Sequence, residues 1–306
     1  MENYAKKLQK IIAASGLSQE KLAEILGVSF VTLNSWVNEK SVPRENKKEK
    51  IDLVAAEFLG SDSCDPEALK SAKKLAKSQH FSVKRLLNNQ DILDSLTVGL
   101  TYHSNATEGS TMTEEDVSAV LFDHAVLSNR SAIEQREAIN HQSALYFLVE
   151  EIAKPDFLFT PELICAVHLR LMNGIISNAG NYRNHGVRIR GAHVPLANYL
   201  KIPELVKNWC DMANSETDDI IELLALTHAK FEQIHPFSDG NGRTGRMLLF
   251  ALALSRGLVP PILRREKRSA YYKYLEICQI REYSDPLELF IANAIIETAR
   301  GMGETL

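Results

Sequence analysis

The stretch HPFSDGNGRTGR, residues 235–246, lies between two segments whose apolar residues repeat at helical spacing. The first segment, residues 220–234, is expected to end as a helix before Pro236, because a proline restricts the residue that precedes it. The second helix is expected over residues 242–256. The sequence therefore predicts two helices that meet at a short polar loop.

The polar loop combines three groups that suit phosphate chemistry. Gly240, Asn241 and Gly242 reach positive φ at little cost, so their backbone N–H groups can converge on an anion at the N-terminus of the second helix. Asp239 offers a hard oxygen donor for Mg²⁺ held together with a phosphate. His235, whose unperturbed pKa is about 6.5, can accept a proton near neutral pH.

Two arginines complete this pattern. Arg243 and Arg246 are three residues apart, so they share one helix face beside the anion. Taken singly, a histidine, an arginine or a GNG turn is more often structural than functional. Their combination within residues 235–246 favours a nucleotide-phosphate site with a base, a metal ligand, an anion nest and two guanidinium groups.

The chain on either side of this region is also mostly helical by periodicity. Further helices are expected over residues 131–152, 161–173, 202–212 and 285–299. Residues 187–195 differ, because apolar and basic residues alternate there before a Gly-Ala turn, which predicts a short β-hairpin. Residues 61–94 give a mixed signal with two plausible helices, 68–78 and 82–88, and are interpreted as a helical connector.

The first sixty residues carry a separate pattern. Ser18 is expected to cap a helix over residues 19–26, Gly27 punctuates, and Ser29 caps a second helix that contains Leu33 and Trp36. Two short helices joined by a tight turn with a glycine are typical of a helix-turn-helix. Basic residues follow between Lys40 and Lys50.

Composition limits what the whole protein can do. The chain has 306 residues, 45% hydrophobic and 24% charged, which is ordinary for globular proteins and allows about two domains. Its net charge of −4 excludes a surface that coats nucleic acid or membrane throughout, so any such contact must be local. The four scattered cysteines fit neither a zinc site nor a disulfide framework. With no apolar stretch long enough to span a membrane and no signal peptide, a cytoplasmic protein without membrane contact is expected.

The stretch at residues 235–246 resembles the signature of the Fic family, HPFx[DE]GNGRxxR, and satisfies it at every position. The similarity runs from about Ser95 to the C-terminus. It implies an all-α fold: a helical bundle around a central pair of helices that carries the motif loop, with a short β-hairpin flap. The implied activity is transfer of AMP from ATP to a Ser, Thr or Tyr hydroxyl of a target protein, with Mg²⁺ and release of pyrophosphate. The expected domains are a helix-turn-helix domain (1–60), a connector (61–94) and a Fic domain (95–306).

The resemblance also assigns roles to individual residues. His235 would be the catalytic base, Asp239 would hold Mg²⁺, and Arg246 would grip the γ-phosphate. The Doc toxins, relatives that phosphorylate their target, have Lys where this chain has Gly242, so transfer of AMP is favoured. The remaining ATP-binding residues implied within the motif are Gly240, Asn241, Gly242, Arg243, Thr244 and Gly245.

Two further regions are assigned to the ATP site by the resemblance. The hairpin would act as a flap that covers the nucleotide and docks the target segment by strand addition. The adenine pocket would be formed by the two tyrosines at 271 and 272 and, less surely, by the glutamine at 279, where relatives often have Asn; ordinary packing is the alternative for the tyrosines. The residues concerned are Arg188, Ile189, Arg190, Gly191, Tyr271, Tyr272 and Gln279.

Residues 104–109, SNATEG, match [ST]xxxE[GN], the inhibitory motif of Fic proteins that carry their own brake. Glu108 would pair with Arg246, in the bidentate manner open to arginine and carboxylate, and so occupy the guanidinium that the γ-phosphate needs. Ser104 belongs to the same inhibitory motif. The same carboxylate could align water for removal of AMP. Without these roles, the stretch would be only a helix start capped by Ser104.

The N-terminal pattern resembles the Cro/repressor helix-turn-helix family, in which the second helix enters the major groove of DNA. Leu33 and Trp36 would pack inward, and specific binding to duplex DNA would need a homodimer. The alternative is a helix-turn-helix fold used for protein contacts only. The residues expected to face DNA are Ser29, Phe30, Thr32, Asn34 and Ser35.

Two functions remain open from the sequence. The first is a self-inhibited protein adenylyltransferase with an attached DNA-binding module. The second is a DNA-binding transcription regulator that uses its Fic domain as a nucleotide sensor or dimerisation module. The complete motif favours the enzyme, because a pure sensor has no need of His235.

Overall fold

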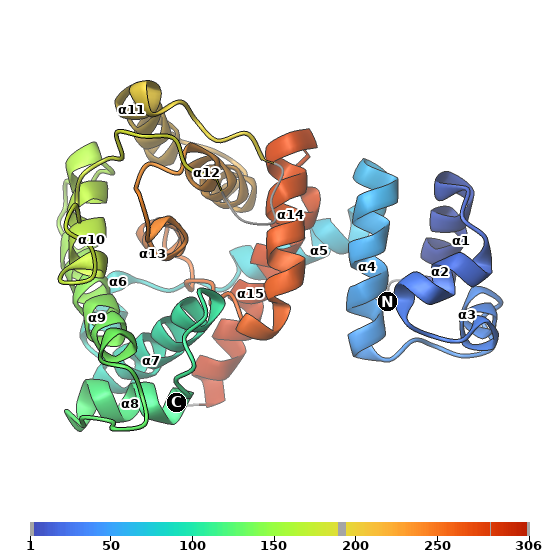
Figure 1. Ribbon diagram of the computed structural model, residues 1–306, viewed down its shortest axis with the longest axis horizontal. Coiled ribbons are helices and arrows are strands. Elements are labelled where there is room, and N and C mark those ends of the chain that lie inside the picture. The colour runs from blue at the N-terminus through green and yellow to red at the C-terminus, as the bar shows by residue number, and fades with distance from the viewer. Residues whose placement is uncertain (1–2, 189–193, 282, 305–306) are drawn as a thin grey trace.

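A computed structural model describes residues 3–188, 194–281 and 283–304. Within these ranges the regular structure is helical, apart from a single antiparallel bridge between His80 and Leu258 (Figure 1). The predicted all-α class is therefore confirmed. The turn of the predicted hairpin lies outside the described residues, and the flanking residues 187–188 and 194–195 belong to no strand.

The first four helices form a small body with its own apolar core. Its interior contains Leu8, Leu22, Leu33, Trp36 and Ile51, so the prediction that Leu33 and Trp36 pack inward is confirmed. Ser18 and Ser29 cap the second and third helices through their hydroxyl oxygens, as expected from the sequence. The helices are α1 (Tyr4–Ser15), α2 (Gln19–Leu26), α3 (Phe30–Val37) and α4 (Glu45–Leu59).

The remaining helices form a larger bundle around α13, which Figure 1 shows end-on in the middle of the ring. Almost every side chain of α13 is buried, and α7, α9, α10 and α12 pack against it. The α-helices of this body are α5 (Pro66–Lys77), α6 (Val83–Leu87), α7 (Gln90–Thr107), α8 (Glu114–Phe122), α9 (Ala132–Ile152), α10 (Pro161–Met172), α11 (Ile202–Asn214), α12 (Ile220–Ile234), α13 (Asn241–Ser255), α14 (Arg268–Arg281) and α15 (Asp285–Glu304). Short 3-10 turns lie at η1 (Gly60–Ser63), η2 (Tyr199–Lys201) and η3 (Arg265–Lys267).

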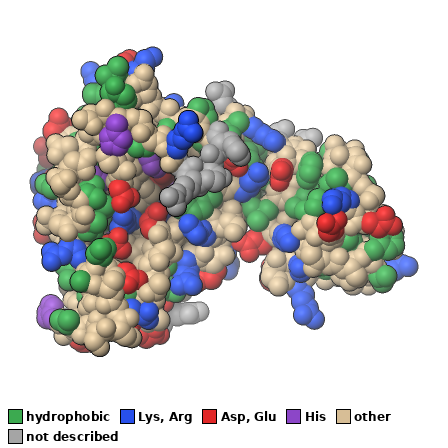
Figure 2. Space-filling model, viewed as in Figure 1, with side chains coloured by type: hydrophobic (Ala, Val, Ile, Leu, Met, Phe, Trp, Pro, Cys, Tyr) green, Lys and Arg blue, Asp and Glu red, His purple; other side chains and the backbone are tan. Residues whose placement is uncertain are grey.

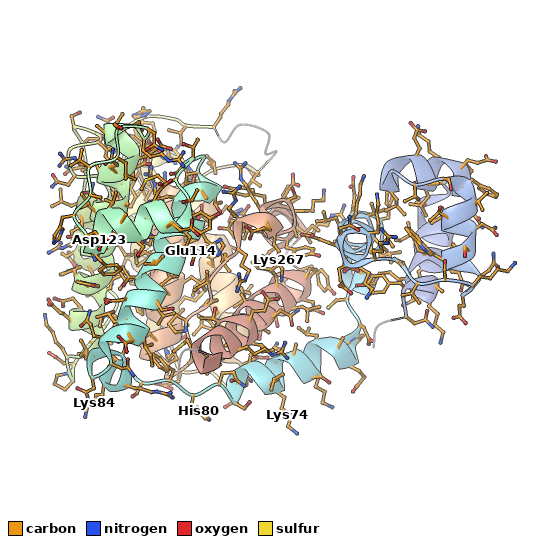
Figure 3. The ribbon with its side chains drawn as sticks, turned by 90° about the horizontal axis from the view of Figure 1, so that it is seen from below. Lys74, His80, Lys84, Glu114, Asp123 and Lys267 are labelled. Atoms are coloured by element: carbon orange, nitrogen blue, oxygen red, sulfur yellow. The ribbon has the colours of Figure 1, made fainter. Side chains whose placement is uncertain are left out.

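The connector between the two bodies is part of the bundle's packing. Helix α5 packs against α15, and the chain then runs along the edge of the bundle past Lys74, His80 and Lys84 (Figure 3). Asn89 caps α7 through its side chain, so this helix starts at Gln90 and crosses the expected boundary at 94/95. The division into three domains stays a prediction.

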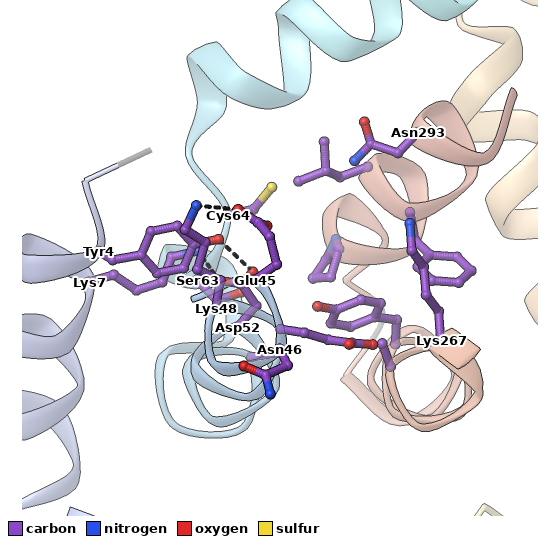
Figure 4. A pocket seen from close by; sticks show the side chains of 17 residues that line it. Tyr4, Lys7, Glu45, Asn46, Lys48, Asp52, Ser63, Cys64, Lys267 and Asn293 are labelled. Carbon is purple, nitrogen blue, oxygen red and sulfur yellow. Dashed lines mark hydrogen bonds and ion pairs between the residues drawn. The ribbon is translucent and has the colours of Figure 1, made fainter. Parts of the chain in front are cut away.

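The two bodies meet through α4, which packs against α14. Arg281 donates a hydrogen bond to the carbonyl oxygen of Glu57 at 3.1 Å. A cavity of about 510 Å³ lies between the two bodies, lined on one side by Tyr4 and Lys7 and on the other by Lys267 and Asn293 (Figure 4). Helix α3 lies on the side of its body away from α14 (Figure 1).

The surface agrees with the expectation that any contact with an extended polyanion is local. On the face drawn in Figure 2, basic and acidic side chains are interspersed over both bodies. Among the helices that the structure describes, none combines the length and the apolar character that a bilayer crossing requires.

Candidate active site

Helix α12 ends at His235, which has the left-handed backbone conformation with φ of 49°. This conformation costs a non-glycine residue about 1–2 kcal/mol. Two hydrogen bonds hold this conformation. Nε of Arg183 donates to the carbonyl oxygen of His235 at 2.7 Å, and the backbone N–H of His235 donates to the carbonyl oxygen of Phe231 at 3.0 Å. The histidine is therefore fixed at the mouth of the polar loop.

The hydrogen bonds of His235 also fix which ring nitrogen carries the proton. Nδ1 lies 3.2 Å from the carbonyl oxygen of Glu232, and a carbonyl oxygen can only accept, so Nδ1 is the donor. Nε2 is left with its lone pair. Burial lowers the pKa of the imidazole, which keeps it neutral near pH 7. These are the properties that a general base requires.

The loop after His235 rests on a histidine that sequence reasoning missed. Phe237 is fully buried and stacks on His168 of α10, with ring centroids 3.6 Å apart. His168 accepts a hydrogen bond from the N–H of Gly180 at 2.9 Å and donates one to the carbonyl oxygen of Asp239 at 3.0 Å. Burial lowers its pKa to about 4, in keeping with this neutral form. No local pattern in α10 marks this residue.

Asn241 closes the loop with its side chain. Its amide group bonds both the N–H and the carbonyl oxygen of Phe237, each at 2.8 Å. The side chain of Asn241 therefore shapes the loop, and the phosphate contact predicted for this residue would have to come from its backbone N–H.

The N-terminus of α13 lies against the carboxylate of Glu108. A Cβ atom built on Gly242 would be 2.3 Å from Oε1 of Glu108, so no larger residue fits there without moving that carboxylate. A negative group thus already lies where backbone N–H groups and the helix dipole favour an anion.

Glu108 also pairs with Arg246, as the sequence predicted. Nη2 of Arg246 donates to Oε1 of Glu108 at 2.6 Å, which gives one hydrogen bond where a bidentate contact was expected. Burial works to raise the pKa of the Glu108 carboxyl, but the guanidinium outweighs it and holds the pKa below its usual range.

Ser104 supports the same arginine. Its hydroxyl accepts a hydrogen bond from Nε of Arg246 at 3.0 Å, and its carbonyl oxygen accepts one from Nη2 at 3.1 Å. The alternative interpretation of this stretch, a helix start capped by Ser104, is wrong, because residues 104–107 form the last turn of α7 and Glu108 is its C-cap.

Arg243 and Asp239 lie close together at the start of α13, with Nη2 of Arg243 4.0 Å from Oδ1 of Asp239, but they differ in exposure. Arg243 is buried, and its Nη1 pairs with Oε1 of Glu137 on α9 at 2.5 Å. The side chain of Asp239 is 63% exposed, and its Oδ1 accepts a hydrogen bond from the N–H of Gly240 at 2.7 Å. In the ranges that the structure describes, no group of three metal-ligating side chains converges, so the accessible carboxylate of Asp239 does not belong to a preformed cluster of three protein ligands.

The family resemblance assigned Thr244 and Gly245 to the ATP site, but the contacts of both residues belong to the structure of α13 and its packing. The hydroxyl of Thr244 is fully buried and donates to the carbonyl oxygen of Gly240 at 2.8 Å. Gly245 faces Glu232 of α12, a second residue that sequence reasoning missed. A Cβ atom on Gly245 would be 2.2 Å from Oε1 of Glu232. Any larger residue at position 245 would therefore require the side chain of Glu232 to move at this close approach of two helices.

Glu232 is a buried carboxyl group whose Oε1 has no hydrogen-bond partner among the described residues. Burial raises its pKa to about 7, against the opposing effect of the Arg246 guanidinium. A polar residue in an amphipathic helix usually lies on the exposed face, so the sequence around Glu232 does not indicate that its side chain is buried.

The Gly245→Ala substitution is expected to lower the free energy of unfolding by about 1–3 kcal/mol, because the added methyl group overpacks the α12–α13 contact. In a Glu232→Ala background the cost should largely disappear, as the opposing carboxyl is gone. Urea unfolding of the four proteins in this double-mutant cycle measures the coupling. Gly303→Ala is the control, because nothing lies within 4 Å of its Cβ position. An equal cost of Gly245→Ala in both backgrounds would contradict the explanation.

The residues expected around adenine have different environments. Tyr271 is only 2% exposed and bonds Nε2 of His228 at 2.8 Å, so it belongs to the core and the packing alternative is favoured. Tyr272 is partly exposed, with the guanidinium of Arg268 5.3 Å from its ring centre. Gln279 donates to the carbonyl oxygen of Ala229 at 3.0 Å. The adenine pocket stays a prediction.

Only part of the predicted flap lies within the described residues. Arg188 is exposed, in a segment without regular structure, and Ile189, Arg190 and Gly191 lie outside the described residues. The flap therefore stays a prediction.

The helix-turn-helix residues expected to face DNA lie on or before α3. Ser29 and Phe30 are exposed, and Thr32, Asn34 and Ser35 are half-buried. Val31, which the sequence pattern did not single out, is 75% exposed.

The match to protein-family models covers two parts of the chain. Residues 158–253 match the Fic/DOC family, and residues 8–50 match a helix-turn-helix family. The first match contains the loop, α12 and α13 as far as residue 253, and the second contains α2 and α3.

Curated relatives include two named protein adenylyltransferase Fic. The one from Nematostella vectensis is 34% identical over 177 residues, which cover 57% of this chain and 41% of the relative. The one from Aedes aegypti is 27% identical over 263 residues, which cover 83% and 47%. The chain thus spans less than half the length of these relatives.

Solved structures share the fold. A fragment of Fic-1 from C. elegans superposes with a TM-score of 0.68 at 23% identity, covering 97% of this chain and 92% of that one. A Fic-domain signalling protein from Bacteroides thetaiotaomicron superposes with a TM-score of 0.65 at 21% identity, covering 76% and 95%. This chain therefore has the helical fold of Fic proteins, its residues 158–253 match the Fic/DOC family, and residues 8–50 before them match a helix-turn-helix family.

Proposed function

We propose that this protein transfers AMP from ATP to a hydroxyl side chain of a target protein. The observation that carries the proposal is the carboxylate of Glu108, which lies at the N-terminus of α13 and on Arg246. The site thus already holds a negative group where the phosphates of ATP would bind. The relatives named protein adenylyltransferase support the same reaction.

The proposed reaction uses His235 as general base. Nε2 takes the proton of the target hydroxyl, the hydroxyl oxygen bonds to the α-phosphorus of ATP, and the bond from that phosphorus to the bridging β-oxygen breaks. AMP stays on the protein and pyrophosphate leaves. The hydrogen bond from Nδ1 to Glu232 keeps the lone pair of Nε2 available, and burial keeps the imidazole neutral at the start.

The phosphates would bind along the N-terminal turn of α13. Backbone N–H groups of residues 240–242 would face the α- and β-phosphates, and Arg246 would hold the γ-phosphate. Asp239 fits a role in holding Mg²⁺ because its carboxylate is exposed beside this turn, and the phosphates would supply further oxygen ligands. Mg²⁺ bound there offsets the negative charge of the nucleotide.

We further propose that Glu108 and Ser104 keep the enzyme inhibited. As long as the Glu108 carboxylate lies on Arg246, the γ-phosphate has no partner and ATP cannot settle with its α-phosphorus in line with the incoming hydroxyl. The same carboxylate, once AMP is on a target, would be placed to align water for its removal.

The test uses ATP labelled in two positions. The full chain and its Glu108→Gly variant are incubated with Mg²⁺ and cell lysate, with the label on the α-phosphate or on the γ-phosphate, and protein-bound label is measured after gel separation. Compared with lysate to which the chain is not added, we expect additional α-label on protein and no additional γ-label, because kinases of the lysate transfer the γ-phosphate by themselves. Additional γ-label without α-label would mean phosphoryl transfer by this chain, and no additional label with either variant would contradict the proposal.

A second function, binding of duplex DNA by the helix-turn-helix region, is favoured by the position of α3. This helix lies away from the bundle, so its outer face is accessible (Figure 1). Two lysine side chains, Lys47 and Lys50, lie at the turn between α2 and α3. Specific binding would require two copies of the chain as a homodimer.

The salt dependence of DNA affinity tests this second function. If a single bound chain neutralises about three phosphates with its lysines, its affinity for duplex DNA is expected to fall about 40-fold between 50 and 200 mM salt. Fluorescence anisotropy of the full chain with a labelled duplex measures this. Absence of DNA binding at low salt would leave protein contacts as the use of this region.

A further inference from the structure

Two apolar side chains at the start of α3 face solvent. Phe30 is 45% exposed and Val31 is 75% exposed, whereas Leu33, Trp36 and Val37 of the same short helix are buried. The apolar core of this body is thus complete without Phe30 and Val31. These two neighbouring apolar side chains are therefore available to a binding partner.

The polar side chains beside them are engaged within the protein. The hydroxyls of Ser29 and Thr32 lie 2.8 Å apart in a mutual hydrogen bond. Asn34 donates to Oε1 of Gln19 on α2 at 3.2 Å. Ser35 is likewise hydrogen-bonded, to the hydroxyl of Ser41 at 2.7 Å. These residues were expected to contact bases, but part of their hydrogen-bonding capacity is already used.

Helix α3 also lacks the side chains that read guanine most directly. It contains neither Lys nor Arg, and a bidentate Arg or Lys contact to guanine is the commonest specific contact in the major groove. Toward the edges of DNA bases, helix α3 therefore offers apolar surface at its N-terminal end. It has few polar groups that are free to form new hydrogen bonds.

Positive charge lies next to this apolar surface. A Cβ atom on Gly27, in the turn before α3, would be 3.5 Å from Nζ of Lys50 and 3.7 Å from Nζ of Lys47. Lys47 also donates to the carbonyl oxygens of Leu26 and Gly27, each at 3.0 Å, which holds its ammonium group at this turn. Two ammonium groups beside the start of α3 complement DNA phosphates and would not favour an apolar protein partner.

We propose that Phe30 and Val31 read thymine, by packing against C5-methyl groups in the major groove of duplex DNA. The methyl of thymine is the apolar group that base pairs present in this groove, so apolar side chains there select thymine over the other bases. This inference rests on the DNA-binding role proposed above. It predicts target sites with thymine at the positions nearest the start of α3.

Replacement of thymine by uracil tests the proposal, because it removes only the methyl group. Duplexes that bind the full chain are first selected from a random pool, and each thymine of the preferred site is then replaced by uracil. We expect affinity to fall about three- to fourfold for each contacted methyl lost, and not to change at other positions. The ratio of the two affinities, for the thymine and uracil sites, is the measured quantity.

Variants show whether Phe30 and Val31 are responsible. In Phe30→Ala and Val31→Ala the ratio should approach one at the position that each residue contacts. Val126→Ala, which truncates a side chain 91% exposed outside the helix-turn-helix region, should keep the wild-type ratio. Because both sites are compared with the same protein preparation, a loss of folding would not mimic this result.

The outcomes separate the inference from the function on which it rests. If the chain binds selected DNA but uracil sites bind as well as thymine sites, or if the selected sites lack thymine, the reading by Phe30 and Val31 is wrong while DNA binding stands. If no duplex is selected, the DNA-binding role itself is contradicted, and the exposed pair is a protein contact.

Discussion

The His235→Ala variant is expected to lose AMP transfer by about 10²–10⁴-fold while binding ATP nearly as well as the parent chain. The base acts on the hydroxyl proton in the transition state, so its removal changes the rate and not the ground-state affinity for nucleotide. The effect is best measured in a Glu108→Gly background, where activity is expected to be high enough to quantify a large loss.

The backbone at position 235 requires a specific control. His235 has φ of 49°, and alanine is strained in that region, so a loss of activity could arise from a shifted loop. His235→Asn keeps a residue that tolerates this conformation and removes the base. His124→Ala applies the same substitution to another histidine with positive φ, 54°, on an exposed loop.

The expected pattern is loss of transfer in both His235 variants with unchanged ATP affinity by calorimetry, and full activity in His124→Ala. Retention of transfer in His235→Asn would contradict the role of the imidazole as base. Loss of ATP affinity in both His235 variants would instead assign His235 to shaping the nucleotide site.

The motif loop could be predicted from sequence because its chemistry is local. Residues 235–246 are consecutive, so the helix end, the glycines and the helix start that surround the anion position could be inferred from spacing alone. The partner of Arg246 was also predicted, although Glu108 is 138 residues away, because the family motif carries its position. Residue spacing alone would have left SNATEG as an ordinary helix start.

What could not be predicted depends on packing between distant helices. His168 supports the loop from α10, and Glu232 faces Gly245 from α12, but nothing in the residue spacing of either helix distinguishes these two from polar residues on an exposed face. Tyr271 was expected near adenine and is buried in the core, because the direction in which α14 faces the bundle is set by its contacts with α12 and α15. Periodicity predicts that a helix has a buried face, and it does not identify the neighbour of that face.

The Glu108→Gly variant is expected to increase AMP transfer, both to lysate proteins and to the chain itself, by up to about 100-fold. If the Glu108–Arg246 contact favours the inhibited state by about 3 kcal/mol, the competent population of the parent chain is below roughly 1%. Removal of the carboxylate frees both Arg246 and the N-terminus of α13. Glycine should be tolerated at this position because Glu108 is the C-cap of α7.

One further substitution separates charge from shape. Glu108→Gln keeps a side chain of the same length beside Gly242 but removes the charge that pairs with Arg246, so activation by Gln assigns the inhibition to the ion pair. A Gln variant that stays inhibited would assign it to occupation of the space at the α13 N-terminus, where the carboxylate oxygen now lies 2.3 Å from a Cβ position.

The Arg246→Ala substitution tests whether Arg246, once released from Glu108, is responsible for the gain in AMP transfer. Glu108→Gly combined with Arg246→Ala should lose the gain in transfer, because the γ-phosphate again has no guanidinium to hold it in place. ATP affinity, measured alongside activity, should rise in Glu108→Gly and fall again in the double variant. If Glu108→Gly leaves both transfer and ATP affinity unchanged, the hydrogen bond of 2.6 Å between Glu108 and Arg246 is a structural contact at the end of α7 and inhibition by this residue is wrong.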